Sequence, residues 1–318
     1  APTLTTYANA AITGVSAANI GSVNSLIAEL SSAATDTSAE VQGAVNAYVA
    51  LLNTADGVAN GNEAITLAQF QTIGLGVINT VAEGQLFNSV VDVASTTSID
   101  TWTELDYLAN VINRISTTVA GGTPTPPLTA NDLALLGITG ATSNNLTDIL
   151  SAIAATPDNG SGVSSLTLLQ SVVNTGIDNA VANSRAVIAN YIGLTGVPTS
   201  GDFVNAGVTG VTSANISSLN TFLAVIPESG SDSQSEVQAT VDALAKIAAA
   251  ANGFADNGAT LNAADYASLG LASIDAAAEV TLLNDVLDSK TASAVDTYVE
   301  VSILASIVTR IIGETTGT

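Results

Sequence analysis

The side chains of this chain that could do chemistry are nearly all carboxylates. Its 318 residues include 28 Asp and Glu but no His and no Cys. The chain therefore has no Ser-His-Asp or Cys-His nucleophile system and no tetrahedral zinc site of the usual ligands. Two carboxylates across a cleft would still suffice for a glycoside hydrolase. We expect pairs such as Asp285 and Asp288 to lie on a solvated helix face instead. Aromatic residues, which would line a sugar cleft, make up only 4% of the chain. We predict no catalytic residues, no cofactor-binding residues and no enzyme activity.

Two loops group oxygen ligands of the kind that calcium prefers. They are Asp56–Asn62, followed by Glu63, and Asn252–Gly258. Neither has the spacing or the terminal bidentate Glu of an EF-hand. Asn, Asp and Gly are also the residues that ordinary turns require. We therefore predict no metal-ligating residues and keep calcium as the alternative for these two loops.

The charge of the chain excludes two classes of partner. Five basic residues stand against 28 acidic ones, which gives a formal net charge of -23. Such a polyanion repels phosphate backbones and anionic lipid surfaces, so we expect no nucleic-acid partner and no membrane docking. Charged residues are only 10% of the chain, and the exposed faces must be polar through Thr, Ser, Asn and Gly. Apolar stretches are too short to span a bilayer, so we expect no membrane insertion.

A short signature recurs along the chain and sets its organisation. Four copies have Thr or Asn, two residues, Asp or Gln and an apolar anchor, followed by Gly and an aliphatic residue. The first copy, from Thr3 to Ile12, is degenerate. The anchors Tyr7, Phe70, Leu133, Phe203 and Tyr266 are 63, 63, 70 and 63 residues apart. This spacing indicates a repeat. Each signature predicts a first helix of about two turns, with the Thr or Asn as N-cap and the Gly as a left-handed C′ residue.

A second helix is predicted after each signature, beginning at Ser16, Thr142 or Thr212 in three of the copies. Asn24, Asn88, Asn220 and Asn284 occupy comparable positions inside the second helices. We expect these amides to bond to local backbone groups or to a neighbouring loop, in preference to a ligand.

A third, longest helix completes each copy. The predicted ranges are Ala39–Asn53, Ile99–Ile115, Leu166–Ile192, Glu236–Ala251 and Ala294–Ile312, with a break at Gly176 left open. Residues 1–119 recur without a gap as 197–315, and the offset of 196 places Trp102 opposite Tyr298. We expect Trp102 to be a core or inter-module anchor, the alternative being a ligand platform.

The predicted fold is all-α, a tandem array of five small three-helix bundle modules with an elongated outline. The modules are residues 1–62, 63–120, 128–196, 197–258 and 259–318, and a Pro-rich linker occupies 121–127. Modules of ~60 residues are near the lower limit for a self-sufficient core, so contacts between neighbours should matter.

The segments Gly207-Val208-Thr209 through Glu236-Val237, and Gly137-Ile138-Thr139 through Leu166, resemble the three-helix GA-type albumin-binding modules of bacterial surface proteins. The wider pattern is similar to helical tandem repeats of large, acidic, Cys-poor surface adhesins of Gram-negative bacteria. That resemblance covers essentially the whole chain, although its motifs are caps and core positions. It implies an extracellular or bacterial cell-surface protein. Albumin binding is not carried over, because the second helices here are poor in basic and aromatic surface residues.

The function expected from these observations is structural or adhesive. The repeats would form a stalk, fibre or surface layer through module–module packing, with neighbouring repeats or copies as partners. The alternative is an array of recognition modules for a host or partner-cell protein. The start at Ala1-Pro2, with no leader, indicates a mature or excised segment.

Overall fold

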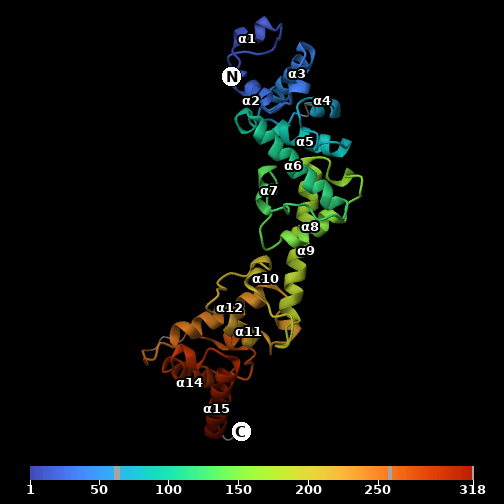
Figure 1. Cartoon of the computed structure of the whole chain (residues 1–318). Helices are drawn as coiled ribbons and strands as arrows, with labels where there is room; N and C mark the ends of the chain where they lie inside the picture. Colours follow the sequence, from blue (N-terminus) through green and yellow to red (C-terminus); the bar gives the residue numbers. More distant parts are fainter. Residues whose placement is uncertain (61–64, 257–259, 317–318) are drawn as a thin grey trace. The chain divides into compact units, whose positions relative to one another are not determined.

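The chain is all-helical. A computed structural model describes every residue except 61–64, 257–259 and 317–318 (Figure 1). The residues that it describes form fifteen α-helices and five short 3-10 helices, and none of them lies in a β-strand. Two isolated bridges, between Asp56 and Ser95 and between Asn252 and Thr291, are the strand-like pairings within these residues. The predicted all-α class is confirmed.

Short, intermediate and long helices follow one another five times, and we number the five sets repeats one to five. The first helices are α1 (Leu4–Asn9), α4 (Leu67–Thr72), α7 (Ala130–Leu135), α10 (Ser200–Asn205) and α13 (Ala263–Ser268). The second helices are α2 (Ile20–Glu29), α5 (Val81–Val93), α8 (Leu146–Ala154), α11 (Ile216–Leu223) and α14 (Ala277–Asp288). The third helices are α3 (Ser38–Thr54), α6 (Trp102–Val119), α9 (Leu166–Ala189), α12 (Gln234–Ala250) and α15 (Tyr298–Thr316). A 3-10 turn precedes each third helix: η1 (Ser32–Ala34), η2 (Thr96–Ser98), η3 (Ser161–Val163), η4 (Glu228–Gly230) and η5 (Ala292–Ala294).

Each first helix is held by the caps that its signature predicts. Its N-cap Thr or Asn forms a reciprocal capping box with the third helical residue, which is Asp in α7, α10 and α13. The predicted C′ glycines adopt the left-handed conformation, with φ between 77° and 87° in the last four repeats. Repeat one has Ala11 at this place, at a φ of 58°, and no other described non-glycine residue has a positive φ. Since a Cβ makes this region costly, the fold imposes the turn even where the sequence lacks glycine.

Three second helices begin one turn later than predicted. In repeat one, Ser16 starts a single turn and α2 itself begins at Ile20. The amide N–H of Ser16 donates to Asn19 Oδ1 at 2.7 Å, and the Asn19 side chain donates to the carbonyl of Gly14 at 3.0 Å. The same pair of bonds forms at Asn145 and at Asn215. The predicted caps at Ser16, Thr142 and Thr212 were therefore wrong, because the Asn three residues later closes the turn that precedes each helix.

The third helices lie near their predicted places, with two corrections. The α6 and α15 helices begin at Trp102 and Tyr298, three or four residues later than predicted, because Thr101 and Thr297 are the N-caps. The α9 helix does not break at Gly176. A Cβ at Gly176 would come within 2.5 Å of the Ile149 Cα atom, so this glycine allows α8 and α9 to pack closely.

The chain divides into two compact units, residues 1–177 and 178–318, with the division inside α9. In the first unit, buried residues from Tyr7 to Val173 form one continuous cluster, so repeats one to three share a core. In the second, a cluster runs from Ile188 to Val308. Repeats two and three pack directly, α6 against α7 and α8, although the Pro-rich segment 121–127 joins them in sequence.

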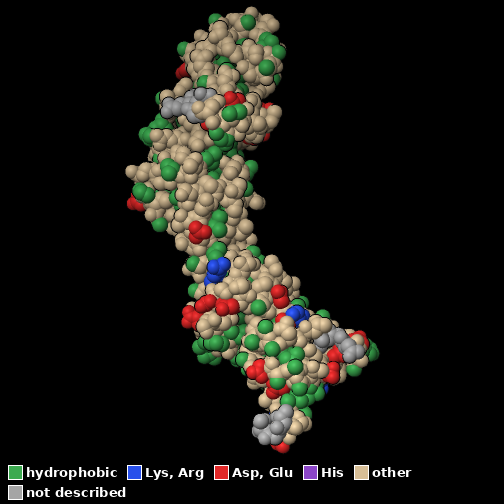
Figure 2. Space-filling view, turned by 180° about the vertical axis from the view of Figure 1, so that it is seen from behind, with side chains coloured by type: hydrophobic (Ala, Val, Ile, Leu, Met, Phe, Trp, Pro, Cys, Tyr) green, Lys and Arg blue, Asp and Glu red, His purple; other side chains and the backbone are tan. Residues whose placement is uncertain are grey.

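The surface is polar with few charges, as predicted. Figure 2 shows one face on which uncharged polar side chains and backbone predominate, with scattered acidic groups and very few basic ones. Of the helices that the structure describes, none combines the length and the apolar run needed to cross a bilayer.

Candidate functional site: the joints between repeats

The recurring asparagines join the second helix of a repeat to the loop before its first helix. Each side-chain amide donates to a backbone carbonyl there, over 2.9–3.1 Å. The four pairs are Asn24 with Pro2, Asn88 with Ile65, Asn220 with Pro198, and Asn284 with Leu261. The prediction that these amides serve the backbone of a neighbouring loop is confirmed.

Hydroxyl groups on second helices hold the start of the third helix in the next repeat. Ser25 Oγ accepts a hydrogen bond from the backbone N–H of Trp102 at 3.0 Å, 77 residues away. Ser89 accepts in the same way from Leu166, and Thr221 from Tyr298, with the same separation of 77 residues. An N–H in the first turn of a helix has no partner within the helix, and these hydroxyls supply one. Each of these bonds links two consecutive repeats through residues that are 77 positions apart in the sequence.

Trp102 and Tyr298 pack at these joints. The indole Nε1 of Trp102 donates to the carbonyl of Ile73 in its own repeat at 2.7 Å, and the backbone N–H of Trp102 donates to Ser25 of the preceding repeat. Tyr298 stacks edge-on against Phe222 of repeat four, with ring centroids 5.9 Å apart. The prediction that Trp102 is a core or inter-module anchor is confirmed, and its counterpart Tyr298 has the same role.

A buried ion pair joins repeats two and three. Arg114 of α6 donates through both terminal nitrogens to Asp132 of α7, at 2.9 and 3.0 Å, and only 10% and 4% of the two side chains are exposed. The guanidinium also donates to the carbonyl of Pro127 at 3.0 Å. Asp132 further accepts hydrogen bonds from the Tyr107 hydroxyl and from Thr129, its N-cap partner. Each charge is thus matched by several partners, as burial requires.

This network fixes the ionisation of Asp132. Burial disfavours the charged carboxylate, but the hydrogen bonds from Arg114, Thr129 and Tyr107 together outweigh it and lower the pKa of Asp132 from 3.8 to about 2. The same contact, together with burial, raises the pKa of the Tyr107 hydroxyl. Asp132 is therefore an anion at physiological pH, with its oxygens occupied by the chain's own donors.

A second joint repeats this arrangement with lysine. Lys246 Nζ of α12 lies 2.7 Å from Asp265 Oδ1 of α13, with 38% and 14% of the side chains exposed. Both Arg114 and Lys246 stand ten residues after the capping-box Glu of their helix, and both meet the third residue of the next first helix. Arg310 occupies the same place in α15, ten residues after Glu300. The basic residues of this chain thus concentrate at one position of the repeat.

The α9 helix is longer, and its basic residue is displaced with it. Arg185 precedes Asp202 by 17 residues, close to the 18 and 19 of the two ion pairs. The longer spacing of 70 between the anchors Leu133 and Phe203 adds seven residues, almost two full helical turns, so the same face is kept. Arg185 Nε is buried without a hydrogen-bond partner among the described residues, and the structure records no ion pair there.

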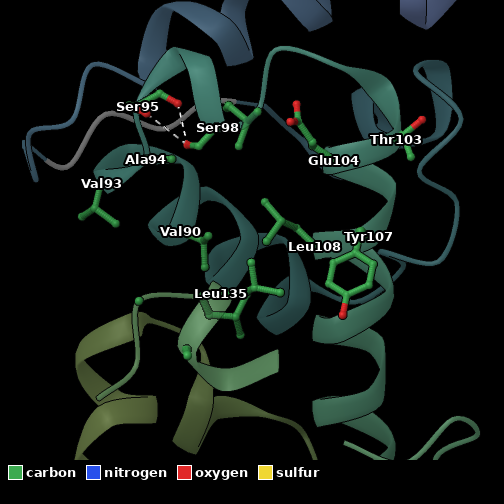
Figure 3. Close-up of a pocket in the computed structure, with 14 residues that line it drawn as sticks. Val90, Val93, Ala94, Ser95, Ser98, Thr103, Glu104, Tyr107, Leu108 and Leu135 are labelled. Atoms are coloured by element: carbon green, nitrogen blue, oxygen red, sulfur yellow. Dashed lines mark hydrogen bonds between the residues drawn. The ribbon is translucent and has the colours of Figure 1, made fainter. Parts of the chain in front are cut away.

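A groove opens beside the Arg114 joint (Figure 3). It has a volume of about 520 Å³ and is lined by residues of α5, η2, α6 and α7. Its walls are mostly aliphatic: Val90, Val93, Leu108 and Leu135 face the space. Three of its polar side chains are engaged by the chain itself: Ser95 and Ser98 bond to each other, and Tyr107 bonds to Asp132. The groove is suited to an apolar side chain and presents no activated nucleophile.

Both predicted calcium loops use their oxygens in turns. Asp56 Oδ1 accepts from the backbone N–H of Val58 at 2.8 Å, and its other oxygen accepts from the Asn60 amide. Asn252 makes the matching turn with Phe254 and also donates to Asp256. Among the described residues, no three acidic side chains come together to hold a metal ion. Residues 61–63 and 257–258 of the two loops lie outside the described residues, so the absence of a metal stays a prediction and calcium stays its alternative.

The predicted exposure of the pair Asp285 and Asp288 needs a correction. Asp285 is exposed, but Asp288 is buried with 4% exposure near the end of α14, and the equivalent Asp92 of α5 is buried at 7%. The prediction of a solvated face was wrong for Asp288. Helical spacing alone predicted an exposed side chain, whereas Asp288 is buried at the last residue of α14.

The joint residues were not predicted, although the sequence contains a signal for them. Five basic residues in 318 are few enough to compare one by one, and three of them share a position relative to a capping-box Glu. Comparing each third helix with the first helix of the following repeat would have found Arg114 with Asp132 and Lys246 with Asp265. The hydroxyl anchors carried no such signal, because their partners are backbone N–H groups.

No family model, no curated protein and no solved structure matches this chain.

Proposed function

We propose that this chain is a non-enzymatic structural or adhesive repeat protein of the bacterial cell surface or extracellular space. Its five three-helix modules would form a stalk, fibre or surface layer by packing on one another. The observation that carries the proposal is the recurrence of the same joint: a hydroxyl anchor 77 residues along and a basic residue meeting the first helix of the next repeat. Repeats joined this way stabilise one another.

The chemistry of the chain supports a scaffold more than a catalyst. The side chains whose pKa values are shifted at the joint between repeats two and three, Asp132 and Tyr107, form a hydrogen bond with each other. A catalytic group needs free access to a substrate and a pKa suited to its task. An activity screen that found glycan turnover, abolished by neutralising one acidic pair, would overturn this part of the proposal.

Assembly of the full chain is the direct test. Sedimentation velocity and electron microscopy between low and high salt should show concentration-dependent, end-to-end or lateral association, strengthened by salt that screens the net charge of -23. Heterologous contacts of this kind do not close and therefore propagate. A strict monomer under all ionic conditions would remove self-assembly and leave a single-chain stalk.

The groove of about 520 Å³ favours a second candidate, recognition of a host or partner-cell protein. Leu135, 56% exposed at its rim, would be an anchor point for a partner's apolar side chain. A pull-down from serum should give one saturable partner that is lost in Leu135→Asp. The matched control is Leu168→Asp, an exposed leucine that is not among the lining residues. Running the pull-down with and without a chelator tests the calcium alternative.

A further inference from the structure

The last helix of the chain repeats a helix whose neighbours are known. The α15 helix matches α6 at an offset of 196, from Trp102 and Tyr298 to Arg114 and Arg310. The surroundings match as well. The α6 helix packs on α5 and α2, and α15 packs on their counterparts α14 and α11. In addition, α6 packs on α7 and α8 of repeat three, whereas α15 is the last helix that the structure describes and has no counterpart of α7 and α8 packed on it among the described residues.

Three side chains of α15 are exposed where their counterparts in α6 are buried. Ile307 and Ile311 of α15 are 46% and 48% exposed, whereas their counterparts Val111 and Ile115 are fully buried. Arg310 is exposed, whereas Arg114 is 8% exposed in its ion pair. Val299 and Ile303 are not informative in this way, because the equivalent Thr103 and Tyr107 remain exposed in α6. We call Ile307, Arg310 and Ile311 the α15 joint face.

We propose that the α15 joint face receives another helical repeat of this chain's own kind, one whose first helix carries an aspartate as its third residue. The inference rests on the proposed function and names the contact that it uses. In α6, the two apolar positions are covered when α7 and α8 pack on the helix, and the arginine meets Asp132. At the other ion pair, Lys246 meets Asp265 at the same position of the next first helix.

Charge and shape both favour this partner. An exposed arginine flanked on its helix by two isoleucines fits an apolar helix pair with one acidic group. A lipid surface or nucleic acid would meet a chain with 28 acidic and five basic residues. The aspartate at the third position also completes the capping box of its own helix, so the docking repeat needs no change in fold to offer it.

The α1 helix is the first helix that the structure describes, and it serves as the probe. Thr6, the third residue of α1, is exposed and stands where Asp132 and Asp265 stand in later repeats. The double variant Thr6→Asp, Arg310→Glu presents an aspartate on α1 for the Arg310 of another chain, but it has no Arg310 of its own to pair with such an aspartate. Mixed with the wild-type chain in low salt and followed by calorimetry, it should bind one to one, at least tenfold tighter than the wild type binds itself.

The receiving chain supplies the controls. Arg310→Glu in the receiver should abolish binding, whereas Lys290→Glu, which changes the charge equally elsewhere, should not. Ile307→Asp should abolish binding, and Val299→Asp, at a position that stays exposed in α6, should leave it intact. Equal binding to the Arg310→Glu receiver, or no binding to the wild type at several hundred micromolar, would overturn the assignment. If the wild-type chain still assembles with Arg310→Glu, the proposed function stands and only this face is wrong.

Discussion

The Tyr266 hydroxyl donates to Asn284 Oδ1 at 2.7 Å and ties the first helix of repeat five to its second. Tyr7 makes the same bond to Asn24 in repeat one, at 2.8 Å. Repeat four has Phe203 in place of the tyrosine, and there Asn220 Oδ1 is buried with no hydrogen-bond partner among the described residues. A buried acceptor left without a donor costs stability, so one missing oxygen atom marks a weak point of this repeat.

Phe203→Tyr should therefore stabilise the chain. The added hydroxyl is expected to reach Asn220 Oδ1 and to raise the free energy of unfolding by about 1 kcal/mol. Chemical denaturation followed by circular dichroism measures the change. Tyr266→Phe is the mirror control and should lower stability by a similar amount. A loss of stability in Phe203→Tyr would show that repeat four has no room for the hydroxyl.

The two ion pairs should differ in their contribution to stability. Arg114→Met leaves Asp132 buried without its cation and should cost about 3–5 kcal/mol. Lys246→Met disturbs a pair whose lysine side chain is 38% exposed and should cost at most about 1 kcal/mol. Denaturant unfolding of the two variants gives the comparison. Equal costs would mean that the burial of Arg114 does not set its energetic role.

The stability of the chain should fall in acid through Asp132. Its pKa is lowered from 3.8 to about 2 in the folded chain, so its contribution is fully present above pH 3.8 and is lost as the pH falls towards 2. We expect Asp132→Asn to be less stable than the wild type at pH 6. The difference between the two should narrow between pH 4 and pH 2 in thermal melts. A difference that stays constant across that window would contradict this ionisation.

Gly176→Ala should be strongly destabilising, against the usual preference of helices. Its new Cβ would overlap the Ile149 Cα atom at 2.5 Å, and α8 would have to move away from α9. A cost of several kcal/mol is expected, in the range of other overpacked sites. Gly21→Ala is the matched control, because Gly21 lies in α2 with nothing within 4 Å of the added Cβ. Gly21→Ala should raise the free energy of unfolding by about 0.5–1 kcal/mol. Thermal melts of both variants measure the two changes.

Local features of the fold could be predicted from the sequence because their partners lie within a few residues. The capping boxes, the left-handed glycines and the length of the first helices are of this kind, as Thr129 with Asp132 shows. The start of α2 was misplaced because Ser16 and Asn19 are both residue types that can cap a helix, and only the fold shows which of them precedes it.

Contacts between repeats could be predicted only in part. Trp102 was identified as an anchor because it is the single Trp and aligns with Tyr298, but its partners Ser25 and Ile73 carry no distinguishing pattern. Asp288 was misplaced because helical spacing within α14 does not show which residues of the last turn are buried by tertiary contacts. The groove beside Arg114 was not predicted, since its walls come from helices of two repeats.

The hydroxyl anchors and the ion pairs would behave differently if whole repeats were gained or lost by recombination of the gene. A backbone N–H can donate to the hydroxyl of any Ser or Thr, so the joint from Ser25 to Trp102 would re-form between almost any two repeats brought together. The pair of Arg114 and Asp132 exists only where a basic third helix precedes an acidic first helix. Chains with rearranged repeats would keep the hydroxyl joints. They would form the ion pairs only where the order of repeats places a basic third helix before an acidic first helix, so a few charged residues would favour particular orders.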